Sequence, residues 1–329
     1  MRVSSKTKRA SAIMLAIACF VVLQASCAGH SRPFRIELIS ASMETEFWTC
    51  IRSGAHAAAK LYNAEIKTFG PGLEKGDSRQ ENLLRQSIAR SPDAIILSGI
   101  DSVEVTGLVN LALNSGIKVV SVESRVNTED NRVLFAGSDN YMLGKSMAQE
   151  IKAALASGMV AVVGQKGGPL SAKEREKGFL EEMAVDSLEY QILEPLYFDF
   201  EALYLGIGPE APAVRILDLL NKNGNPDAVV CLDAQATTSI GRAIDETDYT
   251  PVFLAGVDCS VEQAGLIEQG ILDMTLLQDP YSMGFFGVEL ATKQLSGRMA
   301  DISIHTDVRI ITRENMFSEE NLGLVFPIL

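Results

Sequence analysis

The sequence predicts two doubly wound α/β lobes, each built on a mostly parallel β-sheet. After Phe34, short apolar runs rich in β-branched residues alternate with longer stretches of helical period. The runs are continuous, as expected for strands that helices cover on both faces. The chain has 329 residues, which is more than one hydrophobic core usually serves, so we expect two lobes.

The first 27 residues have the layout of a secretory signal peptide. Four cations lie within the first nine residues, an uninterrupted apolar run covers residues 12–23, and the small residues Ala25 and Ser26 follow. A helix of about 12 residues spans only about 18 Å, too short for a hydrocarbon core of about 30 Å. We therefore expect residues 1–26 to be a signal peptide that is removed on export.

Cys27 stands where a bacterial lipobox places the cysteine that receives a diacylglyceryl group. Ala25 and Ser26 are small residues that the lipoprotein signal peptidase accepts, whereas Gln24 occupies the place where Leu or Val is usual. We expect lipidation of Cys27, which would anchor the protein to the membrane. Ordinary cleavage after Ala28 and simple secretion are the alternative.

The predicted strands and helices follow one another in two β/α halves. The predicted strands cover 35–40, 64–69, 94–97, 118–122, 133–136, 160–163, 190–193, 228–232, 252–255 and 274–277. Helices fill the intervals and supply the crossovers of parallel sheets. Examples are 47–61, 80–90, 103–114, 143–155 and 281–295.

We expect the chain to cross between the two lobes more than once, because no low-complexity linker separates the halves. We assign residues 33–138 plus 279–305 to the N-terminal lobe. Residues 139–278 plus 306–329 form the C-terminal lobe. Connections at strand ends of this kind would let the lobes close by hinge motion.

The net charge and the cysteine content argue against a nucleic-acid-binding protein and against a disulfide-rich fold. Removing residues 1–26 takes away four cations and no anions, which changes the formal net charge from −13 to −17. An acidic chain without a basic run is an improbable partner for nucleic acid. Cys50, Cys231 and Cys259 are an odd, scattered set. We expect all three to be buried thiols, with a Cys231–Cys259 disulfide formed after export as the alternative.

No motif for catalysis, metal or cofactor binding is present. The turn at 164–168 fits neither the dinucleotide fingerprint nor the P-loop and is expected to join a strand to a helix. The three histidines lack metal-ligand spacing, and there is no Gly-x-Ser-x-Gly elbow. We therefore expect neither an enzyme nor a bound cofactor.

Polar and aromatic side chains follow the ends of many predicted strands. Ligands of open parallel sheets bind at the carboxyl ends of the strands. Carboxylates, amides and guanidinium groups can engage two vicinal hydroxyls, while flat rings cover the C–H faces of a sugar. The residues at these places are 42–48, 123–125, 138–140, 164–175, 233–235, Asp258 and Gln278.

Five segments recur in a known order and cover nearly the whole mature chain. They are Glu46-Phe47-Trp48, Gly137-Ser138-Asp139-Asn140, residues 171–179 (SAKEREKGF), Ala255-Gly256-Val257-Asp258 and Leu277-Gln278-Asp279-Pro280. In these segments the sequence resembles the ribose-binding-protein-like periplasmic substrate-binding proteins of sugar ABC transporters. The resemblance implies two hinged lobes around a small ligand, an ABC permease as partner, and a monomer.

For the first lobe, the resemblance implies ring-stacking roles for Phe47 and Trp48 at the start of a helix. Thr45 lies in the turn before them, where the family has an Asn-rich turn. Glu123 and Arg125 flank a serine where ribose-binding members carry an Asp-Arg pair. These departures argue against ribose itself and favour another sugar, a polyol or a cationic ligand.

For the later part of the chain, the resemblance implies a larger polar set. Asp258 and Gln278 follow the strands that bear the family's late polar ligands. Lys173 and Arg175 both compete for the position of the family's cationic ligand-binding residue. Phe198 corresponds to the aromatic residue of the family's second lobe, and Gln235 stands where an Asn is frequent.

Several of these residues also have a purely structural interpretation. Phe47 and Trp48 could be core aromatics at a helix start. Asp258 could be a helix N-cap. Lys173 and Arg175 could lie on a solvated helix face.

We expect an exported, lipid-anchored receptor that delivers a sugar-like ligand to an ABC importer. The alternative is a sensor of the same fold that feeds a membrane kinase or chemoreceptor. A related sugar-responsive repressor is disfavoured, because a signal peptide occupies the place of its DNA-binding helices.

Overall fold

The computed structural model describes most of the chain after the leader. The described residues are 32–71, 80–98, 102–128, 130–166, 168–186, 188–199, 218, 220–222, 224–247 and 253–327. The predicted signal peptide at 1–26 and the predicted lipid site at Cys27 lie outside them. None of the helices in the described ranges is long and apolar enough to span a bilayer.

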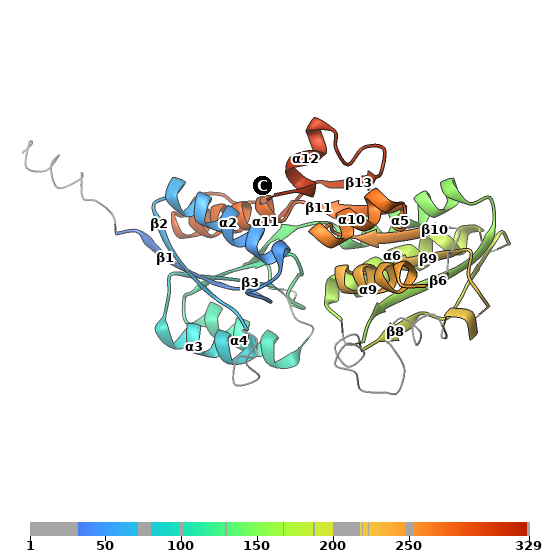
Figure 1. Ribbon diagram of the computed structural model, residues 1–329. Helices are drawn as coiled ribbons and strands as arrows, with labels where there is room; N and C mark the ends of the chain where they lie inside the picture. Colours follow the sequence, from blue (N-terminus) through green and yellow to red (C-terminus); the bar gives the residue numbers. More distant parts are fainter. Residues whose placement is uncertain are drawn as a thin grey trace, which may run out of the picture. The chain divides into compact units, whose positions relative to one another are not determined.

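The first sheet is parallel throughout, with the order β12-β5-β4-β3-β1-β2 among the described residues. Figure 1 labels its strands β1, β2 and β3. Its central strand β3 is buried along its entire length, which explains the uninterrupted apolar run there. The strands are β1 (Phe34–Ile39), β2 (Ala64–Phe69), β3 (Ala94–Ser98), β4 (Lys118–Val122), β5 (Val133–Gly137) and β12 (Ser303–His305).

The second sheet repeats this plan and adds one antiparallel edge strand. Its order is β13-β11-β10-β9-β6-β7, and β8 also pairs with β6. Only β13 runs antiparallel within the described part of this sheet. The strands are β6 (Gly158–Gln165), β7 (Tyr190–Ile192), β8 (Leu196–Phe198), β9 (Ala228–Cys231), β10 (Phe253–Val257), β11 (Met274–Gln278) and β13 (Val308–Thr312).

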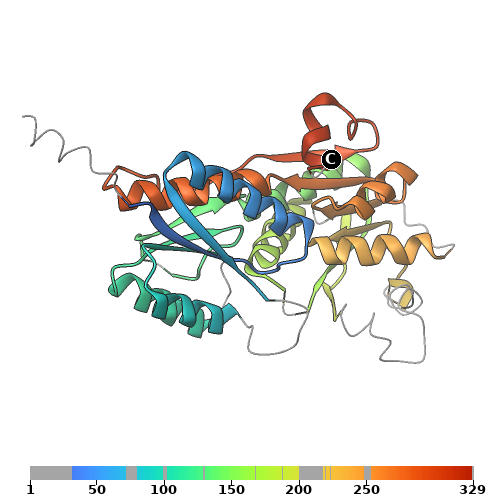
Figure 2. The same cartoon turned by 60° about the vertical axis from the view of Figure 1, so that its left-hand side comes forward.

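Helices cover both faces of each sheet, as Figures 1 and 2 show for α2 and α11 over one face of the first sheet and α3 and α4 over the other. On the second sheet, α5 and α6 pack on one face, and α9 and α10 pack on the other. The helices are α2 (Glu46–Leu61), α3 (Gln80–Arg90), α4 (Val103–Asn114), α5 (Asn140–Ala154), α6 (Leu170–Met183), α9 (Ala234–Asp245), α10 (Val261–Gln269), α11 (Pro280–Leu295) and α12 (Glu319–Val325), with a 3₁₀ turn at Ala184–Asp186.

Reciprocal glycines bring two helix pairs into close contact. Gly54 of α2 and Gly284 of α11 each face the partner's backbone, and so do Gly144 of α5 and Gly178 of α6. A Cβ added at Gly144 would lie 1.9 Å from the carbonyl oxygen of Arg175. The glycines are therefore required for these crossings, because no side chain fits between the backbones.

Capping side chains lie directly before the first residue of several helices. Each oxygen accepts a hydrogen bond from a backbone N–H in the first turn of the helix, which fixes where the helix begins. The capping residues are Thr45, Ser102, Asp139, Asp233, Ser260 and Asp279. Ser260, with Gln263, forms a full capping box at the start of α10. Asp258 is therefore not the cap of that helix, and this structural interpretation is wrong.

The chain passes between the two sheets three times within the described residues. It leaves the first sheet after β5, returns after β11 and leaves again after β12. Ser138 and Thr306, from two of these crossings, have hydroxyl oxygens 3.3 Å apart. The strands of the first sheet thus come from residues 34–137 and 303–305. The exact residues at which one lobe ends and the other begins stay a prediction.

The predicted fold class is confirmed, and each of the ten predicted strands has a counterpart whose ends differ by at most two residues. The short strands β8, β12 and β13 were not predicted. Helix α5 begins at Asn140, three residues before the expected start, because Asp139 caps it. Cys50, Cys231 and Cys259 are free thiols, the first two buried, so the Cys231–Cys259 bridge is not formed.

Candidate functional site

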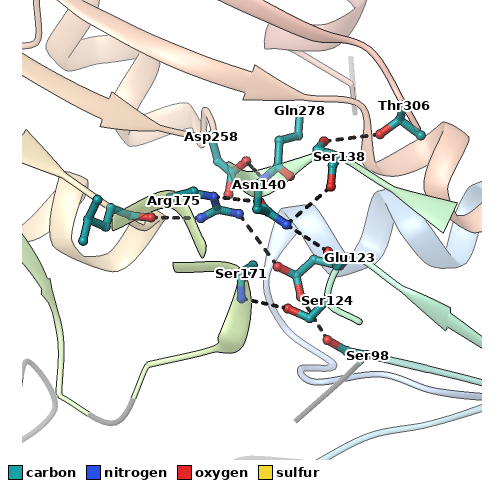
Figure 3. Close-up of polar contacts among 11 residues, drawn as sticks. Ser98, Glu123, Ser124, Ser138, Asn140, Ser171, Arg175, Asp258, Gln278 and Thr306 are labelled. Atoms are coloured by element: carbon teal, nitrogen blue, oxygen red, sulfur yellow. Dashed lines mark hydrogen bonds and ion pairs between the residues drawn. The ribbon is translucent and has the colours of Figure 1, made fainter. Parts of the chain in front are cut away.

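Arg175 of α6 is the central cation of a polar cluster at the carboxyl ends of the strands (Figure 3). Its side chain is only 3% exposed. The Nε atom donates to Asn140 Oδ1 at 2.9 Å, and Nη1 donates to the carbonyl oxygen of Leu232 at 2.9 Å. Nη2 lies 3.9 Å from Glu123 Oε1. The predicted alternative of a solvated face is thus wrong for Arg175.

Two carboxylates, Glu123 and Asp258, face this cluster from equivalent places in the two sheets. Glu123 follows β4 and Asp258 follows β10, each the fourth strand counted from the β2 or β7 edge. Both residues have a φ of +65°, a left-handed conformation that non-glycine residues rarely adopt. The strained backbone turns both acids away from their strands, toward the same cluster.

Asp258 is held by its neighbours and has a shifted pKa. Its Oδ1 accepts a hydrogen bond from Gln278 Nε2 at 2.8 Å. Burial of the carboxylate raises its pKa to about 6, although the nearby Arg175 cation and the Gln278 hydrogen bond act in the opposite direction. A carboxylate with a pKa shifted by burial beside a charged partner is a candidate for a functional site.

A cavity of about 680 Å³, here called the central cavity, opens beside this cluster. It combines an aromatic wall with charged and amide groups, as sugar-sized sites do. Among the residues predicted as ligands, it is lined by Thr45, Phe47, Trp48, Glu123, Lys173, Arg175, Gln235 and Asp258.

The aromatic wall comes from the first turn of α2. Thr45 caps this helix through its Oγ1, which accepts from the Trp48 backbone N–H at 3.5 Å. Phe47 and Trp48 then pack edge to face, with ring centroids 6.2 Å apart. Trp48 is 7% exposed, so its ring belongs to the core on one side and to the cavity on the other.

Three predicted ligands do not line the central cavity. The Arg125 guanidinium stacks over the Phe135 ring, with Cζ 4.0 Å from the ring centroid. Phe198 is 6% exposed and packs into the core of the second sheet, because β8 pairs with β6. Gln278 lies behind Asp258 and orients it.

The lining residues that were missed as individual candidates include Gln80, Ser98 and Ser171. Gln80 Nε2 donates to the Ser98 carbonyl oxygen at 3.1 Å, while its Oε1 has no partner in the described part of the chain. The Ser171 hydroxyl is likewise buried without a partner there. Ser98 Oγ donates to Glu123 Oε2 at 3.0 Å. Ser98 directly follows a predicted strand and could have been found, whereas nothing local distinguished Gln80.

A second cavity of about 600 Å³, here called the side cavity, adjoins the central one. Its walls come from the start of α2, from α9 and α10, from the β11–α11 junction and from α12. The two cavities share Thr45, Phe47, Ala234, Gln235 and Asp258. In the described ranges, no cluster of three His, Cys, Asp or Glu side chains could hold a metal ion.

Comparison with known proteins identifies relatives of the entire fold. The D-ribose/D-allose-binding protein of Pseudomonas aeruginosa is 25% identical, with 94% of this chain and 99% of the relative covered. A solute-binding protein of an ABC transporter from Agrobacterium vitis, solved with bound D-fucose, has a TM-score of 0.78 and 25% identity. That alignment covers 88% of this chain and 99% of the other.

A third relative is known as part of an assembly. The structure described as the XylFII–LytSN complex has a TM-score of 0.74 and 25% identity, covering 86% of this chain and 99% of that chain. The expected resemblance to sugar-binding substrate-binding proteins is confirmed. Residues 36–299 match the family described as "Periplasmic binding protein domain", and the chain therefore belongs to this family of solute-binding proteins.

Proposed function

We propose that this protein is an exported receptor of an ABC importer that binds a small sugar-like ligand in the central cavity. The observation that carries the proposal is the pairing of Trp48 with the Glu123–Arg175–Asp258 cluster around one cavity. Stacking rings and paired charges are what a polyhydroxylated ligand needs when it leaves water. The family and its sugar-binding relatives support the same function.

The ligand would pair with polar atoms that have no partner in the described part of the chain. Gln80 Oε1 can accept a hydroxyl hydrogen bond, and the Ser171 hydroxyl can donate or accept one. A ligand lacking a matching hydroxyl would leave a buried group unpaired, which makes the site selective. Lys173 and Gln235, which also line the cavity, would complete the set.

The ligand is sought by a thermal-shift and calorimetric screen of pentoses, hexoses, polyols and nucleosides. A binder raises the melting temperature and changes the emission of Trp48, the only tryptophan. Asp258→Ala should weaken binding by about tenfold or more, because a charge-assisted hydrogen bond is lost. Asp301→Ala, at an exposed position outside both cavities, is the matched control. Binding that leaves Trp48 emission unchanged would contradict this site.

We further propose that Cys27 carries a lipid anchor. Its position after Ala25 and Ser26 supports this, and the family supports export. Incorporation of labelled fatty acid in the native host should be lost in Cys27→Ser. Equal labelling of the variant would show that Cys27 is not the anchor.

A sensor role is the second candidate, and one comparison favours it. A structural neighbour at 25% identity was solved in the XylFII–LytSN complex, as a component of a larger assembly. The pocket would serve either role. Stimulation of a reconstituted permease ATPase by the loaded receptor supports the importer; stimulation of a membrane kinase in its absence supports the sensor.

A further inference from the structure

We propose that the ligand is a glycoside, with its sugar ring in the central cavity and an apolar aglycone in the side cavity. This inference rests on the sugar-binding function proposed above. The central and side cavities have five lining residues in common, among them Phe47 and Asp258. A single molecule can therefore extend past these shared walls from one cavity into the other.

Three charged groups line the side cavity and not the central one, and each is bonded to another part of the protein. Glu46 Oε2 accepts from the Val261 backbone N–H at 3.2 Å. Arg242 donates to both oxygens of Glu262, at 2.7 and 2.6 Å. The Asp279 carboxylate accepts from the backbone and hydroxyl groups in the first turn of α11. Each of these groups therefore already has a partner within the protein.

The amide of Gln263, another wall residue, is also engaged. Its Oε1 accepts from the Ser260 backbone N–H at 2.7 Å, and its Nε2 donates to the Val257 carbonyl oxygen at 3.1 Å. What the side cavity offers a ligand is therefore mainly apolar surface. This surface comes from Phe47, Cys50, Leu277, Pro280, Leu324 and Pro327.

The central cavity has an aromatic wall as well, but it carries more polar surface. Its walls include the unpaired Gln80 Oε1 and Ser171 hydroxyl and the charged cluster around Arg175. Hydroxyls are therefore best placed in the central cavity, and a hydrocarbon or aromatic group is best placed in the side cavity. A free monosaccharide would leave the side cavity without an apolar occupant.

The test is calorimetric titration with free pentoses and hexoses and with the methyl and phenyl glycosides of each, as both anomers. We expect at least one phenyl glycoside to bind about tenfold or more tightly than its free sugar and its methyl glycoside. If free sugars bind and every phenyl glycoside binds more weakly, the inference is overturned and the sugar receptor stands. If no sugar or glycoside binds, the proposed receptor function fails and this inference fails with it.

A pair of variants locates the aglycone. Thr238 of α9 lines the side cavity and not the central one, so Thr238→Phe should abolish the advantage of the phenyl glycoside and leave free-sugar affinity unchanged. The control is Thr106→Phe on α4, which lines neither cavity and should change neither affinity. An undiminished advantage in Thr238→Phe would overturn the assignment of the aglycone to the side cavity.

Discussion

Asp258 shows how a single side chain can link ligand binding to stability. Its pKa of about 6 in the folded protein compares with about 3.8 in an unfolded chain. The folded state therefore binds this proton more tightly than the unfolded state. Its contribution to stability is present at pH 4, is lost as pH rises toward 6, and stays lost above that value.

We predict that Asp258→Asn is more stable than the wild type at pH 7.5, by roughly 2–3 kcal/mol. The neutral amide avoids the burial of a charge, and its oxygen can still accept from Gln278. The gain should disappear near pH 4, where the native carboxyl is protonated. Urea unfolding of both proteins at pH 4 and 7.5 measures this. Parallel pH profiles would show that Asp258 does not titrate as inferred.

At the residue scale, the sequence predicted the centre of the polar cluster better than the residues at its edge. Asp258 and Arg175 were predicted because motifs surround them. Glu123 and Arg125 were predicted because ribose-binding members of the family carry an Asp-Arg pair at this point of the chain. The left-handed turn at Glu123 and the ring of Phe135 decide where the Arg125 guanidinium goes, and neither depends on a local sequence pattern. Gln80 joins the site only because α3 begins beside β3.

At the scale of elements, the helix pair α5–α6 determines where Arg175 lies. Gly144 touches the carbonyl of Arg175, so the position of the guanidinium depends on this close crossing. We predict that Gly144→Ala reduces affinity for the best sugar of the screen by more than about tenfold and destabilises the fold by more than about 1 kcal/mol. Calorimetry and urea unfolding measure the two effects.

The matched control is Gly107→Ala in α4. Apart from the two neighbouring residues and the helix's own backbone, no atom lies within 4 Å of a Cβ added there. This variant should retain full affinity and gain about 0.5–1 kcal/mol, because alanine favours the helix. Unchanged ligand affinity in Gly144→Ala would show that Arg175 does not depend on the crossing.

The elements found from sequence were those with long apolar or periodic signals. Strands β3 and β4 are buried along nearly their whole length and were predicted to within one residue. Strands β8 and β12 have three residues each and exist because a neighbouring strand pairs with them. A segment that short carries too little pattern to be separated from a loop.

At the scale of the whole molecule, Glu46 joins the part of the fold built on the first sheet to the part built on the second sheet. It begins α2 on the first sheet, and its carboxylate accepts from the N-terminus of α10 on the second sheet. A carboxylate at a helix N-terminus contributes about 0.3–1 kcal/mol. This contact should therefore favour, before any ligand arrives, the arrangement in which the starts of α2 and α10 meet, here called closed.

We predict that Glu46→Ala lowers the ratio of closed to open molecules about two- to fivefold without ligand. Small-angle X-ray scattering of the free protein should then give a larger radius of gyration than for the wild type. Glu44→Ala, at an exposed position two residues earlier, is the control and should scatter like the wild type. Identical scattering by both variants would contradict a role of Glu46 in closure.

The three crossings between the sheets also have a consequence for the integrity of the molecule. A protease that cuts the chain at Ser138, between β5 and α5, leaves the connections after β11 and β12 intact. The same holds for a single cut at either of the other two crossings. A receptor exposed to extracellular proteases would thus keep both halves together after one cleavage, whereas two lobes on a single linker would separate.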